Sequence, residues 1–327
     1  MLSPLITTPE EDKTFYMRGN YTKKVLLGLK LALRRITDVI RANDYDIIVI
    51  AREAFFTGST FFERALSRRK GKLIFDFDDS IWLNVISNNN RLFSSLKDGS
   101  KTARIIQLSD KVFAGNEFLA DYAKKFNDNV VIIPTTIDTD AYQPAYDTNK
   151  KTVTIGWSGS VTTIEHFQFA IPPLRILKDK YKDRIVIKVI GDGNFFEPLL
   201  NIRGIPWKSE TELDDLREID IGIMPLPDNE WTWGKCGLKG LQYMALEIPT
   251  IMSPVGVNLN IIKDGVNGYL ANSTEEWVDK ISALIEQPDL RSRIGKEGRK
   301  TVVTKYSVKS MQEVYLHQME AVLAVNH

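Results

Sequence analysis

Short apolar runs alternate along most of the chain with longer segments in which apolar residues recur every three to four positions. The short runs are rich in β-branched residues, as strands are. In the first 150 residues the predicted strands are 45–50, 72–77, 110–114 and 129–134, and the predicted helices include 54–68 and 115–126. Because the predicted strands are continuously apolar and separated by helices, they indicate a parallel sheet with helices on both faces.

A polar, proline-containing stretch at 135–151 interrupts this alternation and is predicted to be a linker. A second series follows, with strands at 152–157, 184–191, 220–226, 248–253 and 267–271, and with closing helices at 274–286, 288–305 and 308–325. We therefore predict an α/β protein of two doubly wound, Rossmann-like domains, residues 1–146 and 147–307, and a C-terminal helix, 308–327, that can pack back on the first domain. Ligands of such domains bind beyond the carboxyl ends of the strands, so we expect them in a cleft between the domains.

The composition excludes some classes of protein but does not identify the function. The chain has 327 residues, enough for two domains, and its net charge of +1 gives no reason to expect nucleic acid as a partner. Its one cysteine, Cys236, excludes an internal disulfide framework. No apolar run approaches the ~20 residues of a membrane-spanning helix, and the N-terminus has no signal-peptide pattern. We expect a cytoplasmic protein.

The segment 231–256 carries the most specific polar pattern. A turn-like WGKCG precedes a predicted helix, which leads directly into the strand IPTIMS. On this helix Lys235, Lys239 and Gln242 are spaced to share one face. Unpaired N–H groups at the helix start and the two lysines would hold a diphosphate, and Gln242 would accept a sugar hydroxyl. The alternative is a solvated lysine face on an ordinary amphipathic helix, which the spacing alone favours.

Together with its surroundings, this segment resembles a known family. Residues 233–271 are similar to the donor-binding signature of GT-B glycosyltransferases of group 1, often called family 4. Further pieces fit in the family's order: 109–138, IGWSGS at 155–160, VIGDG at 189–193, DIGIMPLPDNEW at 220–231 and TKYS at 304–307. The resemblance implies the GT-B fold, in which two Rossmann-like domains face each other across a cleft. It also implies retaining transfer of a sugar from a UDP- or GDP-linked donor to a hydroxyl acceptor, without cofactor or metal, in bacterial cell-surface polysaccharide or lipopolysaccharide assembly.

Several donor-side roles follow from the resemblance. The helix start at Gly237, Leu238 and Lys239 falls where the family binds the donor diphosphate. Gln242 falls where the family has the second glutamate of its E-x7-E motif, which binds the ribose, and Gly234 falls on the first. A glutamine oxygen still accepts a ribose hydroxyl, but the bond is roughly half as strong as one to a carboxylate.

The nucleotide half of the cleft would also include Ser158, Gly159, Ser160 and Gly191. Ser160 falls near the family's phosphate-binding arginine, so one positive charge is replaced there. Lys239 is the first candidate to supply that charge, and Lys235 is the second. Gly191 begins a G-D-G segment that lacks the third glycine of a dinucleotide fingerprint, so we interpret it as a tight strand-to-helix turn.

Three carboxylates, Asp76, Asp78 and Asp79, stand where the apolar strand at 72–77 ends. In the resembling family a histidine near the acceptor and the anomeric carbon occupies the position of Asp78. Asp78 is therefore the candidate catalytic residue on the acceptor side, as Lys239 is on the donor side. Two other interpretations stay open. Asp76 or Asp79 can cap the following turn, and a D-x-D triplet can hold Mg²⁺ or Mn²⁺ on a nucleotide-sugar, although that use belongs to the GT-A fold.

Departures from the family's motifs support a second possible function. Both acidic positions, the arginine and the histidine are replaced. The first residues resemble the end of the family's second strand, so either the recorded start is late or the N-terminal domain is shortened. The alternative function is that of a degenerate GT-B module, which binds nucleotide or glycan without turnover.

A basic amphipathic helix is predicted at 21–42. Leu26, Leu29, Leu33 and Ile36 form one apolar stripe. The flanking basic residues are Lys23, Lys24, Lys30, Arg34, Arg35 and Arg41. Such a helix can lie on an anionic membrane, at its inner face and near a lipid-linked acceptor. Alternatively, the stripe packs on the sheet of the first domain and the basic residues are merely solvated.

Overall fold

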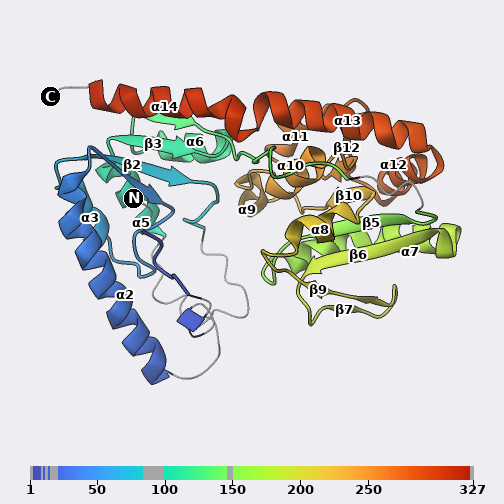
Figure 1. The fold of residues 1–327 in the computed structure, drawn as a ribbon, viewed down its shortest axis with the longest axis horizontal. Coiled ribbons are helices and arrows are strands. Elements are labelled where there is room, and N and C mark those ends of the chain that lie inside the picture. Colours follow the sequence, from blue (N-terminus) through green and yellow to red (C-terminus); the bar gives the residue numbers. More distant parts are fainter. Residues whose placement is uncertain are drawn as a thin grey trace. The chain divides into compact units, whose positions relative to one another are not determined.

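The computed structural model describes residues 3–8, 10–11, 14, 21–83, 99–145 and 150–324. The chain divides into two compact units (Figure 1). The first comprises Met1–Ile133 together with Leu316–His327, and the second comprises Pro134–Tyr315. Each unit is built around its own parallel sheet.

The first unit contains a four-stranded parallel sheet in the order β1-β2-β3-β4. Its strands are β1 (Ile47–Ala51), β2 (Lys72–Phe77), β3 (Lys111–Ala114) and β4 (Val130–Ile132). Its helices include α2 (Tyr21–Arg41), η1 (Ala42–Asp44), α3 (Phe61–Ser67), α5 (Ser100–Leu108) and α6 (Glu117–Ala123). The four strands lie within the predicted apolar runs. The central strand β3 is buried along its whole length, as expected for a sheet covered on both faces.

The helix predicted at 54–68 is shorter in the structure, because the buried side chain of Lys101 binds the backbone of the residues that precede Phe61 in the sequence. The ammonium of Lys101 donates to the carbonyl oxygens of Phe55 and Thr57, the latter at 2.8 Å. These bonds satisfy backbone groups that a helix would otherwise pair. Helix α3 therefore begins only at Phe61.

The second unit contains a six-stranded sheet in the order β12-β11-β10-β5-β6-β9. Its strands are β5 (Val153–Ser158), β6 (Ile185–Gly191), β9 (Ile205–Pro206), β10 (Ile221–Met224), β11 (Thr250–Met252) and β12 (Tyr269–Leu270), all parallel. A small antiparallel pair, β7 (Phe196–Glu197) and β8 (Ile202–Arg203), stands apart from this sheet.

The helices of the second unit follow the predicted pattern closely, and α12 and α13 have the predicted bounds. The earlier ones are η2 (Ile164–Ala170), α7 (Ile171–Tyr181), η3 (Lys182–Arg184), α8 (Glu212–Arg217), α9 (Glu230–Trp233), α10 (Leu238–Ala245) and α11 (Asn258–Ile261). The last three are α12 (Thr274–Glu286), α13 (Pro288–Lys305) and α14 (Val308–Ala324). No helix in the described part of the chain combines the length and the apolarity that crossing a bilayer requires.

Alternate residues of the central strands in the second unit face opposite sides of the sheet. Ile223 and Ile251 belong to the apolar core beneath α7 and α12. Their neighbours Met224 and Met252 belong to the core beneath α10. This alternation between two apolar faces produces the continuously apolar runs that predicted a sheet covered on both sides.

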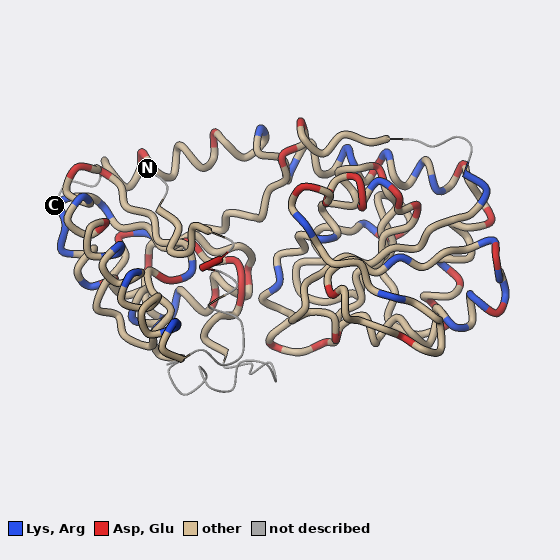
Figure 2. The backbone as a smooth tube through the Cα atoms, turned by 60° about the horizontal axis from the view of Figure 1, so that its bottom comes forward, with Lys and Arg blue, Asp and Glu red and all other residues tan. Residues whose placement is uncertain are grey.

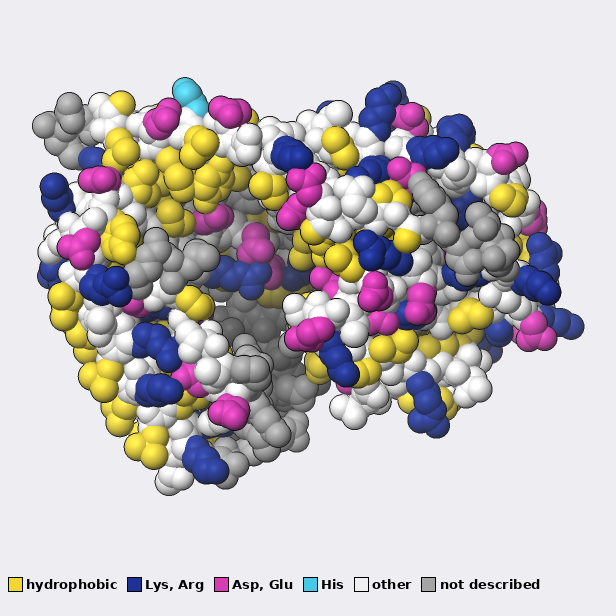
Figure 3. Space-filling view, viewed as in Figure 1, with side chains coloured by type: hydrophobic (Ala, Val, Ile, Leu, Met, Phe, Trp, Pro, Cys, Tyr) yellow, Lys and Arg dark blue, Asp and Glu magenta, His cyan; other side chains and the backbone are white. Residues whose placement is uncertain are grey.

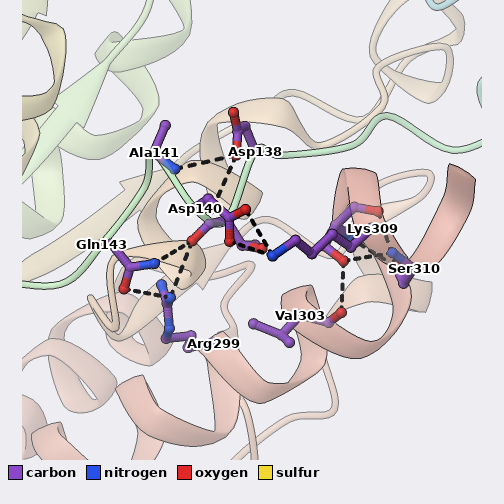
Figure 4. A network of polar contacts seen from close by, with 10 residues as sticks. Asp138, Asp140, Ala141, Gln143, Arg299, Val303, Lys309 and Ser310 are labelled. Atoms are coloured by element: carbon purple, nitrogen blue, oxygen red, sulfur yellow. Dashed lines mark hydrogen bonds and ion pairs between the residues drawn. The ribbon is translucent and has the colours of Figure 1, made fainter.

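The first half of the predicted linker is fixed to the second unit (Figure 4). Ile137 forms a strand-like bridge with Ser307, and Lys309 of α14 pairs with Asp140 at 2.8 Å. The unit boundary accordingly lies between residues 133 and 134, where the sequence placed it after residue 146. Helix α14 begins in the second unit and ends in the first.

Arg299 of α13 holds the same stretch at several points (Figure 4). Its guanidinium donates to the carbonyl oxygens of Thr139 at 3.3 Å and Tyr142 at 2.7 Å, and to the side-chain oxygen of Gln143 at 3.0 Å. It also donates to the carbonyl oxygen of Ala245, the last residue of α10. One side chain thus ties the segment around Tyr142 to the end of α10.

Candidate functional site

The order of the second sheet indicates a ligand site at the carboxyl end of β5. From β5 the chain proceeds outward through β6 to β9, and it returns to the opposite side of β5 as β10. In doubly wound sheets, ligands bind where the strand order reverses in this way. The last residue of β5 is Ser158, whose N–H donates to the hydroxyl of Tyr243 on α10 at 2.6 Å. Because Tyr243 is fully buried, this bond holds α10 against the end of β5.

Helix α10 begins with an arrangement suited to an anion. Its N-cap, Gly237, has a φ of +72°, and a Cβ there would come within 2.4 Å of Ile261 Cδ1, so backbone and packing both require glycine. The first amide groups of any α-helix lack acceptors within the helix and form its positive end. Leu238 is exposed at this end, and Lys239 follows it in the first turn. Amides and an ammonium together can bind a diphosphate.

A carboxylate that the sequence patterns did not single out organises the side chains around Lys239. Glu212, the first residue of α8, accepts hydrogen bonds from Trp207 Nε1 and from the Tyr142 hydroxyl, both at 2.9 Å. It also lies 3.6 Å from Lys239 Nζ. Burial alone would raise the pKa of Glu212, but these partners outweigh burial and hold the pKa below its ordinary value.

Gln242, one turn further along α10, has its amide nitrogen bound and its amide oxygen unused. Nε2 donates to the Tyr142 hydroxyl at 2.6 Å and to Glu212 Oε1 at 3.2 Å. The Tyr142 hydroxyl donates its proton to Glu212, so both neighbours can only accept from Gln242. The side-chain end that faces them must therefore be the amide nitrogen, and the other end is the oxygen. Gln242 is only 4% exposed, and its Oε1 has no hydrogen-bond partner among the described residues. A buried oxygen without a partner costs roughly 1–3 kcal/mol, and this atom can accept a hydrogen bond from a hydroxyl or N–H group.

The residues Tyr142, Trp207, Glu212, Lys239 and Gln242 form what we call the Glu212 cluster. Burial lowers the pKa of Lys239, and the Glu212 carboxylate acts in the opposite direction. Burial also raises the pKa of Tyr142 to about 12, with a further contribution from Glu212, so the Tyr142 hydroxyl keeps its proton. A largely buried ammonium with one carboxylate at 3.6 Å is only weakly neutralised, and a bound diphosphate would add the opposing charge it lacks.

The loops after β5 and β6 lie against each other. The N–H of Gly159 donates to the carbonyl oxygen of Ile190 at 2.9 Å. Gly191 has a φ of +148°, and a Cβ there would lie 2.9 Å from the carbonyl oxygen of Gly159. The close approach of the two loops therefore requires glycine at 191, and the structure brings these two predicted site residues together.

The two predicted serines have different surroundings. The hydroxyl oxygen of Ser158 is buried and has no hydrogen-bond partner within the described ranges, so it is a second unsatisfied polar atom beside α10. Ser160 is exposed, and its N–H donates to Thr163 Oγ1 at 2.8 Å. Serine is uncharged, so position 160 does not supply the positive charge that the family's arginine would provide there.

The structure corrects the placement of Lys235. The sequence put Lys235 on one helix face with Lys239, but α10 begins only at Leu238, because the left-handed Gly237 separates the two turns. Lys235 lies before the helix, and its Nζ is 4.3 Å from the centre of the Trp231 ring, a cation–π contact. Of the two lysines, only Lys239 belongs to the Glu212 cluster.

The three aspartates after β2 belong to the first unit. Asp78 Oδ1 accepts from Arg52 Nε at 2.7 Å, and both side chains are half exposed. Asp79 Oδ1 accepts from the N–H of Ser80 at 3.0 Å, which agrees with a turn-capping role. Burial raises the pKa of Asp76 to about 6, and the charge of Asp78 adds to this. Within the described ranges, no group of three or more His, Cys, Asp or Glu side chains is arranged to hold a metal ion.

Sequence patterns missed three residues of the Glu212 cluster. Glu212 stands in an acidic run that resembles a solvated face, and Trp207 follows a two-residue strand. Tyr142 lies in the predicted linker, and an aromatic residue within a polar stretch was the one available signal. Tyr142 and Glu212 contact Gln242 from 100 and 30 positions away in the sequence, which no local pattern can anticipate.

Comparison with known protein families and sequences identifies relatives of the chain. The model of the family described as "Glycosyl transferases group 1" matches residues 138–301. The uncharacterized glycosyltransferase MJ1178 of Methanocaldococcus jannaschii is 30% identical over 135 residues, which cover 38% of each protein. The putative glycosyltransferase EpsD of Bacillus subtilis is 31% identical over 80 residues, covering 24% of this chain and 21% of that protein. The chain therefore matches well under half the length of either relative.

Solved structures match over a larger share of the chain. A glycosyltransferase from Rickettsia africae has a TM-score of 0.66 at 16% identity, covering 94% of this chain and 83% of that one. The Anabaena protein Alr3699/HepE, in complex with UDP and glucose, has a TM-score of 0.66 at 13% identity, covering 89% of this chain and 82% of that one. At such identities the likeness concerns the fold, and it confirms the predicted GT-B fold class.

Proposed function

The chain belongs to the glycosyl transferases group 1 family, and we propose that it is a glycosyltransferase that uses a nucleotide-diphosphate sugar. In the proposed reaction, the bond between the anomeric carbon and the β-phosphate oxygen breaks, and a bond to the acceptor hydroxyl oxygen forms. The acceptor's proton passes to the departing phosphate, so no strong protein base is needed. The products are the glycosylated acceptor and a nucleoside diphosphate.

The unpartnered oxygen of Gln242 is the observation that most supports this proposal. It is buried, it lies one turn from the start of α10, and its partner amide nitrogen is already bound. A ribose hydroxyl is a donor of suitable chemistry for it. The family's ribose-binding glutamate falls at this position, which adds support to the proposal.

The diphosphate would bind at the start of α10. There the helix amides and Lys239 stabilise the negative charge that develops on the leaving group, which is the main electrostatic task of the transition state. Lys239 would exchange its 3.6 Å contact with Glu212 for a closer contact with phosphate. Because these groups supply the positive charge, we propose that the reaction needs neither a metal ion nor another cofactor.

Glu212 and Tyr142 would act as positioning residues. Each accepts a hydrogen bond from Gln242 Nε2, at 3.2 Å and 2.6 Å, and together they direct Oε1 away from themselves. Arg299 in turn fixes the backbone of Tyr142 at 2.7 Å. This arrangement would present the amide oxygen in one orientation before the nucleotide arrives, which lowers the entropic cost of binding.

The remaining features of the reaction are proposals by family resemblance. They comprise a UDP- or GDP-linked donor, retention of configuration, an acceptor in cell-surface polysaccharide or lipopolysaccharide assembly, and a cytoplasmic site of action. The binding of UDP and glucose by the Anabaena structural relative makes UDP-glucose the first donor to test. Asp78, half exposed and bonded to Arg52, would contact the acceptor.

A donor screen tests the proposal. The full chain is incubated with UDP-, GDP- and ADP-sugars in the presence of a chelator, and release of nucleoside diphosphate is followed. We expect release from one donor class, and loss of that release in Lys239→Ala but not in Lys296→Ala, which removes an exposed lysine of α13. Tight nucleotide binding without release from any donor would instead indicate the degenerate, non-catalytic module.

A further inference from the structure

Helix α2 of the first unit exposes a continuous apolar stripe (Figure 3). Leu26, Leu29, Leu33, Ile36 and Ile40 are between 43% and 66% exposed. They recur at the three- and four-residue spacing that places side chains on one helix face. A helix of this length is about 30 Å long, so the stripe is long and only one helix wide. Scattered single apolar residues are normal on a surface, but a contiguous row indicates a binding surface.

The same helix packs on its own unit through a different face. Leu27, Leu31 and Val39 are buried there, and Arg35 pairs with Asp38 at 2.9 Å. The interpretation in which the stripe packs on the sheet of the first domain is therefore wrong. The core of this unit packs against the face of α2 that carries Leu27, Leu31 and Val39, so the exposed stripe is left for another surface to cover.

Basic residues follow one edge of the stripe. Residues 21–72 contain twelve basic and five acidic residues. The rest of the chain contains 31 basic and 37 acidic residues, so the basic excess is confined to this segment. Lys23, Lys30 and Arg41 follow one edge of the stripe at helical spacing, and all three are exposed. Glu11 pairs with Lys30 at 2.8 Å, but one carboxylate does not offset the local excess.

The neighbouring helix extends the basic surface. Arg64 of α3 is exposed, as are Arg68 and Lys70 just after the helix and the apolar Phe61 at its start. Lys and Arg positions recur along the helices of the first unit in Figure 2. Apolar and basic side chains thus occur together over α2 and α3, so an occupant must offer both an apolar interior and negative charge.

We propose that α2 binds the surface of a bilayer that contains anionic lipids. The apolar stripe would enter the boundary between headgroups and acyl chains, and the basic residues along its edge would contact lipid phosphates. A narrow apolar stripe with lysine and arginine at its edge is typical of a helix that lies in this interface. Membrane binding itself requires no donor. Only its benefit, access to a lipid-linked acceptor, rests on the proposed function.

Vesicle flotation tests this surface. The full chain is floated with vesicles of phosphatidylcholine alone and of phosphatidylcholine mixed with phosphatidylglycerol. We expect flotation with the anionic vesicles and little with the neutral ones, and we expect added salt to weaken it. The double variant Leu29→Ser/Leu33→Ser should reduce vesicle affinity by at least about tenfold. Its matched control is Leu316→Ser/Leu323→Ser, which changes two exposed leucines of α14 and should float like the wild type.

Two further measurements separate this proposal from others. Circular dichroism and calorimetric UDP binding should be unchanged in Leu29→Ser/Leu33→Ser, since the substitutions touch neither the core nor the donor site. Lys23→Gln/Arg41→Gln should bind anionic vesicles more weakly and with a smaller salt dependence than the wild type. Equal flotation of wild type and Leu29→Ser/Leu33→Ser would overturn the proposal. So would a wild type that ignores vesicles but changes from dimer to monomer on the same substitution, because the stripe would then join two copies of the chain.

Discussion

The carboxyl ends of β5 and β2 both carry polar groups, yet these groups are organised differently. Beyond β5, the buried oxygens of Ser158 and Gln242 have no partners in the described part of the chain. Beyond β2, Asp78 and Asp79 are bonded to Arg52 and to the turn backbone, and Asp78 is half exposed. At the first end two buried oxygens lack donors, whereas at the second Asp78 and Asp79 have partners.

This difference separates two kinds of polar cluster that resemble each other in sequence. Unsatisfied buried atoms cost stability unless a ligand completes them, so the end of β5 is preorganised for binding. Half-exposed, paired carboxylates cost little and can exchange partners easily. We infer that donor affinity resides at β5 and α10, and that the end of β2 contributes contacts to a less tightly held group.

The largest effect should come from Asp76, a partly buried carboxyl near the end of β2. Burial raises the pKa of Asp76 from 3.8 to about 6, so between these values the folded state holds a proton that the unfolded state has lost. Stability is therefore fully present below pH 4 and falls as the pH rises through 6. Asp76→Asn removes this loss and should stabilise the first unit at pH 7.5 by up to about 3 kcal/mol.

Hydrogen exchange of the β2 and β3 amides, corrected for the intrinsic rate at each pH, measures this effect in the first unit alone. Asp79→Asn is the matched control, because it removes a neighbouring negative charge, keeps an oxygen that can accept from the Ser80 N–H, and leaves Asp76 unchanged. Parallel pH profiles for wild type and Asp76→Asn would contradict the burial of a titrating carboxyl there.

The next effect concerns Lys239 at the end of β5. Lys239→Ala should weaken UDP or GDP binding by about 1–2 kcal/mol, roughly the value of one charged hydrogen bond. Isothermal calorimetry checks this, with the exposed Lys296→Ala as control. Unchanged affinity in Lys239→Ala would make Lys239 a structural partner of Glu212 and nothing more.

A smaller effect is expected at Asp78. Asp78→Asn should lower turnover about tenfold at saturating donor, because it weakens contact with the acceptor, and it should leave the donor's KM within about twofold. Stability should hardly change, since half-exposed ion pairs contribute little. Steady-state kinetics with varied donor and acceptor provide the test, and Asp121→Asn on α6 is the surface control. Full activity would return Asp78 to a purely structural role.

Periodicity predicted the elements well because it reports which residues are buried. The bounds of α12 and α13 and the four strands of the first unit follow from apolar spacing alone. In α2, however, the stripe with Leu29 and Leu33 and the row with Leu27 and Leu31 are both apolar. Spacing cannot decide which one faces the core, because that depends on the shape of the surface beneath.

The candidate site was only partly predictable for a similar reason. Lys239 and Gln242 were found because they lie close together on one helix. Lys235 was misplaced because a left-handed residue, Gly237, separates two turns that a continuous helix would join. Glu212 and Tyr142 reach Gln242 from distant segments, and only the packing of α8 and the 134–145 segment on α10 brings them there.

Ribose recognition by Gln242 is the central claim, and binding of deoxynucleotides tests it most directly. Calorimetry would compare UDP with its 2′-deoxy and 3′-deoxy analogues for the wild type and for Gln242→Met, which keeps a side chain of similar size without the amide. The wild type should prefer UDP over one analogue by about 1 kcal/mol, the value of one hydrogen bond, and Gln242→Met should lose that preference. An equal preference in both proteins would contradict the assignment of Gln242 Oε1 to the ribose.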